Sequence, residues 1–120
     1  MSVEGMWAIY FGDVAGGQVN SGIIVLETER LFGGDSLMAY RGNYTVSNGH
    51  VQGTGQVWAY NPTVQAITAF GQPNPEPQEV RLEGDLQPES DPLVIEGLIW
   101  RTSAPGIQLP ARLVKICDLP

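Results

Sequence analysis

Cysteine, histidine and basic residues are all scarce in this chain of 120 residues. The single cysteine, Cys117, excludes an internal disulfide and fits a reducing compartment. Six lysine and arginine residues stand against 13 aspartate and glutamate residues, which gives a formal net charge of −7. Surfaces that bind nucleic acid or anionic membranes need clustered cations, so this balance argues against both kinds of partner.

Long apolar runs are missing as well. No stretch approaches the ~20 apolar residues that a membrane-spanning helix needs. The segment Met1 to Gly5 lacks the basic residues that open a secretory signal. We therefore expect a cytoplasmic protein without a membrane segment. The length predicts a single domain over residues 1–120, and hydrophobic residues make up 42% of the chain, enough for one core.

Helical periodicity is nearly absent, and short alternating runs separated by turn signals predict an all-β fold. The clearest element is a hairpin around Asn48-Gly49, the preferred pair for a two-residue type I′ turn. That turn sets a register in which Tyr44 faces Gly53 and Tyr40 faces Val57. One face of the hairpin is then apolar and the other polar.

Further short runs have the same strand character. About eight strands in sequential hairpins predict a small antiparallel up-and-down barrel of the calycin or lipocalin type, with an aligned sandwich as the alternative. Residues 61–77 contain four prolines and are expected to form one long loop. The expected strands are Gly5–Phe11, Gly22–Leu26, Leu31–Phe32, Met38–Ser47, His50–Ala59, Glu79–Leu86, Leu93–Trp100 and Leu109–Cys117.

The chain shows no arrangement of residues that is typical of a catalytic, metal or cofactor site. His50 follows a tight turn, where neither an orienting partner nor exclusion of water is evident. Asp35, in Gly-Gly-Asp-Ser, is expected to bond its own backbone. Cys117 is expected to be a small buried hydrophobe. We therefore predict a protein that is not an enzyme and holds no metal or cofactor.

Aromatic residues dominate the predicted interior. They could line a barrel cavity for a small apolar ligand, although aromatic residues also fill ordinary cores, and the filled core is the favoured interpretation. The candidate lining residues are Trp7, Phe11, Tyr40, Tyr44 and Trp58.

Two further patterns concern the first and seventh expected strands. Gly5-Met6-Trp7 has the Gly-x-Trp form found at the first strand of lipocalin-like barrels, and we expect Arg112 to cover Trp7. The outward face of the seventh strand is apolar, and exposed apolar clusters usually have a use. Its residues Val94, Leu98 and Trp100 are the candidate dimer or partner patch.

Four segments in the first half of the chain resemble the GrlR family, small bacterial β-barrel proteins named for a negative regulator of type III secretion genes. The resemblance covers roughly residues 4–60, and its most specific part is the Gly-Gly-Asp segment. The four segments are Glu4–Phe11, Gly22–Val25, Leu31–Ser36 and Tyr40–Tyr44.

The resemblance implies a lipocalin-like homodimer that performs no chemistry. It also implies a protein that binds a transcriptional activator and keeps it off DNA. The family makes that contact through an acidic run in a hairpin, where this chain has Ser47, Asn48, Gly49 and His50. We therefore expect a protein-interaction module whose partner is unidentified, with binding of a small apolar ligand as the alternative.

Overall fold

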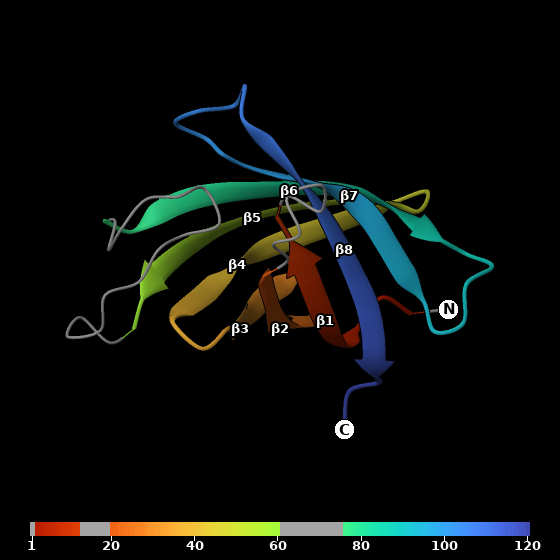
Figure 1. Ribbon diagram of the computed structural model, residues 1–120. Coiled ribbons are helices and arrows are strands. Elements are labelled where there is room, and N and C mark those ends of the chain that lie inside the picture. The colour runs from red at the N-terminus through yellow and green to blue at the C-terminus, as the bar shows by residue number, and fades with distance from the viewer. Residues whose placement is uncertain (1, 13–19, 61–75) are drawn as a thin grey trace.

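The computed structural model describes residues 2–12, 20–60 and 76–120, which form eight antiparallel strands closed into a barrel. Each strand pairs with the next, and β8 returns to pair with β1, so the predicted up-and-down barrel is confirmed (Figure 1). Residues 61–75 of the expected loop lie outside the described residues. The strands are β1 (Gly5–Phe11), β2 (Asn20–Glu27), β3 (Arg30–Gly34), β4 (Met38–Ser47), β5 (His50–Ala59), β6 (Gln78–Gln87), β7 (Val94–Arg101) and β8 (Gln108–Cys117).

The β4–β5 hairpin has the predicted register along its whole length. Tyr44 pairs with Gly53 and Tyr40 pairs with Val57. Asn48 and Gly49 have φ values of 51° and 78°, as a type I′ turn requires. The turn therefore sends Tyr40 and Tyr44 to the inner face of the barrel, where both are buried.

The β2–β3 turn has the same backbone geometry with less suitable residues. Thr28 and Glu29 have φ values of 49° and 64°, a region in which β-branched and bulky residues are strained. The backbone N–H of Thr28 donates to Oε2 of Glu4 at 2.8 Å, and the carbonyl of Glu29 accepts from the N–H of Tyr44 at 3.0 Å. These contacts hold a turn that its own residues do not favour.

Two glycine pairs let neighbouring strands approach closely. Gly42 pairs with Gly55 and Gly84 pairs with Gly97. A Cβ atom on Gly42 would lie 2.0 Å from the carbonyl oxygen of Thr54, too close for any side chain. Glycine at these positions is what strongly curved sheets need, because curvature brings backbones together.

One end of the barrel, here called the closed end, is covered by residues 2–4. Trp7 is fully buried there, and its Nε1 donates to the carbonyl of Val3 at 2.8 Å. Nζ of Lys115 donates to the carbonyl of Ser2 at 2.9 Å and lies 2.7 Å from Oδ1 of Asp118. That hydrogen bond holds the pKa of the Asp118 carboxyl below its ordinary value. Both ends of the described chain are thus tied to the closed end.

The expectation for Arg112 was wrong. Arg112 pairs with Tyr10 on the outer face, and its Nε lies 3.1 Å from Oε1 of Glu96. Lys115 is the cationic residue opposite Trp7, because the β1–β8 register shifts between Met6 and Trp7.

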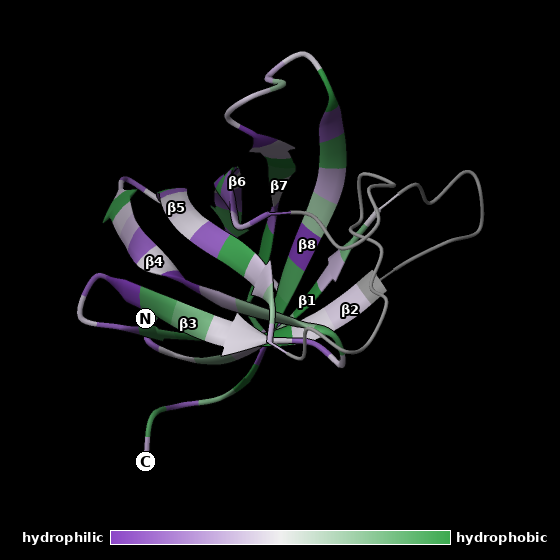
Figure 2. Ribbon diagram, turned by 90° about the vertical axis from the view of Figure 1, so that its left-hand side faces the viewer, coloured by the Kyte–Doolittle hydropathy of each residue, from purple (hydrophilic) through white to green (hydrophobic). Residues whose placement is uncertain are grey.

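The hydrophobic core is densest toward the closed end. Hydrophobic and hydrophilic residues alternate along the strands, as a barrel wall with one buried face requires (Figure 2). The described residues include no helix with the length and apolar character needed to cross a membrane. The largest side chains that are fully buried are Trp7, Leu26, Ile95, Leu113 and Val51.

Candidate functional site

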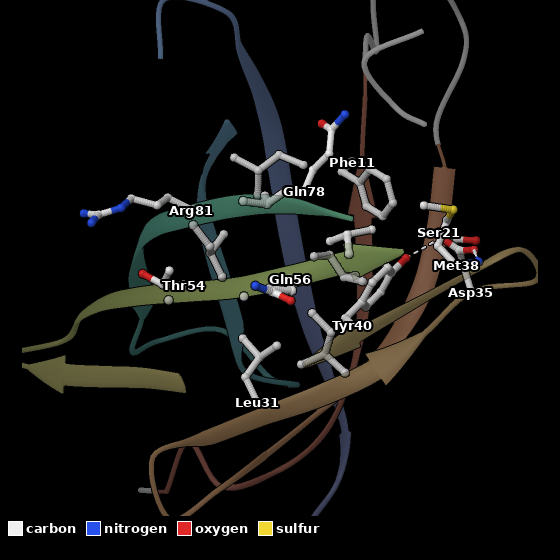
Figure 3. Close-up of a pocket in the computed structure, with 18 of the residues that line it drawn as sticks. Phe11, Ser21, Leu31, Asp35, Met38, Tyr40, Thr54, Gln56, Gln78 and Arg81 are labelled. Carbon is white, nitrogen blue, oxygen red and sulfur yellow. Dashed lines mark hydrogen bonds between the residues drawn. The ribbon is translucent and has the colours of Figure 1, made fainter. Parts of the chain in front are cut away.

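The other half of the barrel interior is hollow. A cavity of about 380 Å³ lies between β1–β2, the β3–β4 loop and strands β5–β7 (Figure 3). This volume is within the range typical of small-molecule sites. The interior is therefore filled toward the closed end and hollow toward the opposite end, here called the mouth. Its apolar lining includes Ile9, Phe11, Ile24, Leu31, Val57 and Val80.

Glycines on the inner face of β5 leave room for the cavity. Gly53 and Gly55 both line it, and neither carries a side chain that could reach across the barrel. A Cβ atom on Gly53 would lie 3.4 Å from Cδ1 of Leu31, which is ordinary contact. The sequence pattern of alternating small residues between Val51 and Val57 was the available signal for this hollow.

Asp35 and Tyr40 form a polar pair in the wall of the cavity. Oδ1 of Asp35 accepts from the backbone N–H groups of Leu37 and Met38 at 2.9 and 2.7 Å. Oδ2 of Asp35 accepts from the hydroxyl of Tyr40, as the dashed line in Figure 3 shows. The prediction that Asp35 bonds its own backbone is confirmed, whereas its contact with Tyr40 was not foreseen.

A glycine on β2 makes the contact between Asp35 and Tyr40 possible. A Cβ atom on Gly22 would lie 3.0 Å from the hydroxyl oxygen of Tyr40 and 3.2 Å from Cβ of Asp35. Burial raises the pKa of the Tyr40 hydroxyl, and the hydrogen bond to Asp35 raises it further. The Tyr40 hydroxyl therefore stays protonated at neutral pH and donates a hydrogen bond to Asp35.

The loop that carries Asp35 is braced from outside the cavity. The hydroxyl of Tyr60 donates to the carbonyl of Ser36 at 2.6 Å. The backbone N–H of Asp35 donates to the carbonyl of Met38 at 2.9 Å. The carboxylate is thus held in one position by backbone and side-chain contacts, which favours selective binding over loose contact.

The structure separates the five aromatic candidates. Phe11 and Tyr40 line the cavity. Trp7 and Tyr44 are buried but do not line it. Trp58 was wrongly assigned to the lining, because it pairs with Ala39 and strand alternation places it on the face opposite Val57.

The proposed partner patch on β7 is only partly exposed. Leu98 has 42% of its surface exposed, and Trp100 is half-buried. Val94 was wrongly assigned to an exposed patch, because it is buried with only 6% exposed. Its neighbour Ile95 is buried as well, so both faces of β7 are covered at this point.

The hairpin tip is exposed at Ser47 and Asn48, and two acidic residues of β6 approach it. Nδ1 of His50 lies 2.9 Å from Oδ1 of Asp85, and Nε2 lies 3.4 Å from Oε1 of Glu83. The hydrogen bonds to Asp85 and then to Glu83 raise the pKa of the His50 imidazole. Sequence reasoning missed these partners, because they lie on the adjacent strand rather than in the hairpin.

Other candidate chemistry is sparse in the described part of the chain. Residues 2–12, 20–60 and 76–120 bring together no group of three or more His, Cys, Asp or Glu side chains that could hold a metal ion. Cys117 is exposed at the end of β8, so the expectation that it is buried was wrong. No protein-family model matches the sequence, and no curated protein matches it either.

Proposed function

We propose that this protein binds a small, largely apolar molecule inside the barrel and performs no chemistry on it. The cavity of about 380 Å³ carries this proposal, because its apolar wall has a few fixed polar groups, as ligand sites do.

The experiment is saturable binding of a neutral fluorescent probe, N-phenyl-1-naphthylamine. Val57→Phe places a ring inside the cavity. It should weaken probe binding at least about tenfold, because the ring occupies volume that the probe needs. Val46→Phe is the matched control, because Val46 is 39% exposed and does not line the cavity.

Circular dichroism should show that both variants keep the fold. Equal affinity in Val57→Phe and Val46→Phe, or no saturable binding to the native protein, would count against the proposal.

A second candidate function is a GrlR-like protein-interaction module that forms a homodimer and regulates transcription of secretion genes. An apolar area on the outer face of β1–β3 favours it. Met6, Tyr10, Ile23 and Phe32 are each about two-fifths exposed there, and their strands are adjacent. Surfaces of this kind usually mark sites of protein association. An activator partner would meet Glu83 and Asp85 beside the hairpin tip in place of the family's acidic run.

Sedimentation of the protein at tens of micromolar tests the homodimer. Phe32→Ser should shift the protein toward monomer, because it removes a large apolar side chain from this area. Leu98→Ser is the control for the patch expected on β7. A strict monomer before any substitution would contradict this second function.

A further inference from the structure

The Asp35–Tyr40 pair offers hydrogen-bond acceptors to the cavity and no free donor. Three donors already point at the Asp35 carboxylate: two backbone N–H groups and the Tyr40 hydroxyl. A carboxylate has about four acceptor positions, so one is left for a ligand. The one proton of Tyr40 is committed to Asp35, and its oxygen therefore retains only acceptor capacity.

Six further polar residues line the cavity: Ser21, Ser36, Thr54, Gln56, Gln78 and Arg81. The hydroxyl groups of Ser21 and Ser36 accept hydrogen bonds as well as donate them, so they are compatible with a ligand that donates. Thr54, Gln56 and Arg81 belong to the outward-facing set of their strands, and Figure 3 shows the guanidinium of Arg81 directed away from Tyr40. Gln78 contributes an amide to the lining. In Figure 3, Phe11 lies between this amide and Asp35.

A buried cation near this region does not take part in the lining. Arg101 pairs with Val80 on the inner face, but it is not among the residues that line the cavity. Two charged residues line the cavity, Asp35 and Arg81. Asp35 lies beside Tyr40, whereas the guanidinium of Arg81 is directed away from Tyr40 (Figure 3), so the charge nearest to the polar pair is negative.

Charge and size narrow the ligand further. An anionic head group would face the carboxylate of Asp35 in an apolar surrounding, where like charges repel strongly. The chain's net charge of −7 acts in the same direction. A cavity of about 380 Å³ lies at the small end of the range for ligand sites, which favours a short hydrocarbon chain.

We infer that the cavity takes an apolar amine, whose ammonium group donates to Asp35 and Tyr40 while its hydrocarbon chain lies among Ile24, Leu31 and Val57. This inference rests on the proposed binding function and adds the chemical class of the ligand. It excludes fatty acids of the same length.

The test is displacement of the neutral probe by octylamine, octanol and octanoate at equal ionic strength. These compounds share a chain and differ in the head group. Octylamine should displace the probe at concentrations at least about tenfold lower than octanoate, with octanol between them. The comparison uses the unaltered protein, so it does not depend on any variant folding.

Asp35→Asn identifies the group responsible. Asparagine keeps an oxygen for the N–H groups of Leu37 and Met38 but removes the charge, so the preference for octylamine over octanoate should fall to within about threefold. Glu89→Gln is the matched control, because it removes one charge from the exposed β6–β7 turn. It should keep the preference.

The outcomes separate the two proposals. If the probe binds and octanoate displaces it as well as octylamine does, the ligand class is wrong and the binding function stands. The same conclusion follows if Asp35→Asn keeps the full preference. If the probe does not bind at all, the binding function itself fails.

Discussion

At the scale of single residues, two side-chain contacts fix groups that no sequence motif links. Tyr40 reaches Asp35, and His50 reaches Asp85, a residue 35 positions away. Neither contact can be recognised from the types of residue involved. The His50 contact follows from the β5–β6 register, which pairs His50 with Asp85. The Tyr40 contact depends on the β3–β4 loop, whose backbone N–H groups hold the Asp35 carboxylate.

His50 should titrate above its ordinary pKa of 6.5, because Asp85 and Glu83 both stabilise the imidazolium form. The stability that these contacts contribute is complete below the ordinary pKa and is lost as the pH rises through the raised value. NMR titration of the imidazole should show the raised midpoint, and Asp85→Asn should lower it. A midpoint unchanged by Asp85→Asn would contradict the assigned cause.

At the scale of elements, the two tight turns show what sequence can and cannot predict. Asn48-Gly49 is recognisable because these residues tolerate positive φ, and the whole β4–β5 register followed from it. Thr28-Glu29 carries no such signal, because neither residue type favours positive φ. Contacts with Glu4 and Tyr44, which lie elsewhere in the sequence, hold this turn. The sequence could not decide between a filled and a hollow interior for a similar reason, because the space inside a barrel depends on how all strands combine.

Glu29→Gly should stabilise the protein by about 1 kcal/mol, because glycine adopts the left-handed conformation without the steric cost that other residues bear. The carbonyl that binds Tyr44 belongs to the backbone and is retained. Glu27→Gly, in the adjacent strand, should instead lower the stability of the protein. Denaturant unfolding measures both changes in stability. A loss of stability in Glu29→Gly would contradict the prediction, because the contacts of the Glu29 side chain would then outweigh the strain of its positive φ.

At the scale of the whole molecule, closure pairs every strand on both sides and leaves no sheet edge exposed among the described strands. Sequence predicted this closure from the number and spacing of strands. It could not place Trp58 or Val94, because one faces outward despite its size and the other is covered despite its outward position.

A ligand that occupies the cavity should raise the melting temperature, because it binds the folded state alone. At a concentration 100 times its Kd, the expected gain is about 2.7 kcal/mol. Octylamine should therefore shift the transition by several degrees, and Val57→Phe should abolish the shift. Thermal unfolding followed by circular dichroism provides the measurement, and an equal shift in both proteins would indicate binding elsewhere.

The ties among Ser2, Lys115 and Asp118 gather both chain ends at the side of the barrel remote from the mouth. A tag, fluorophore or fusion attached at either end would then lie away from the cavity. Protein immobilised on a sensor through such an attachment would present its mouth to the flowing solution, in either orientation of the fusion.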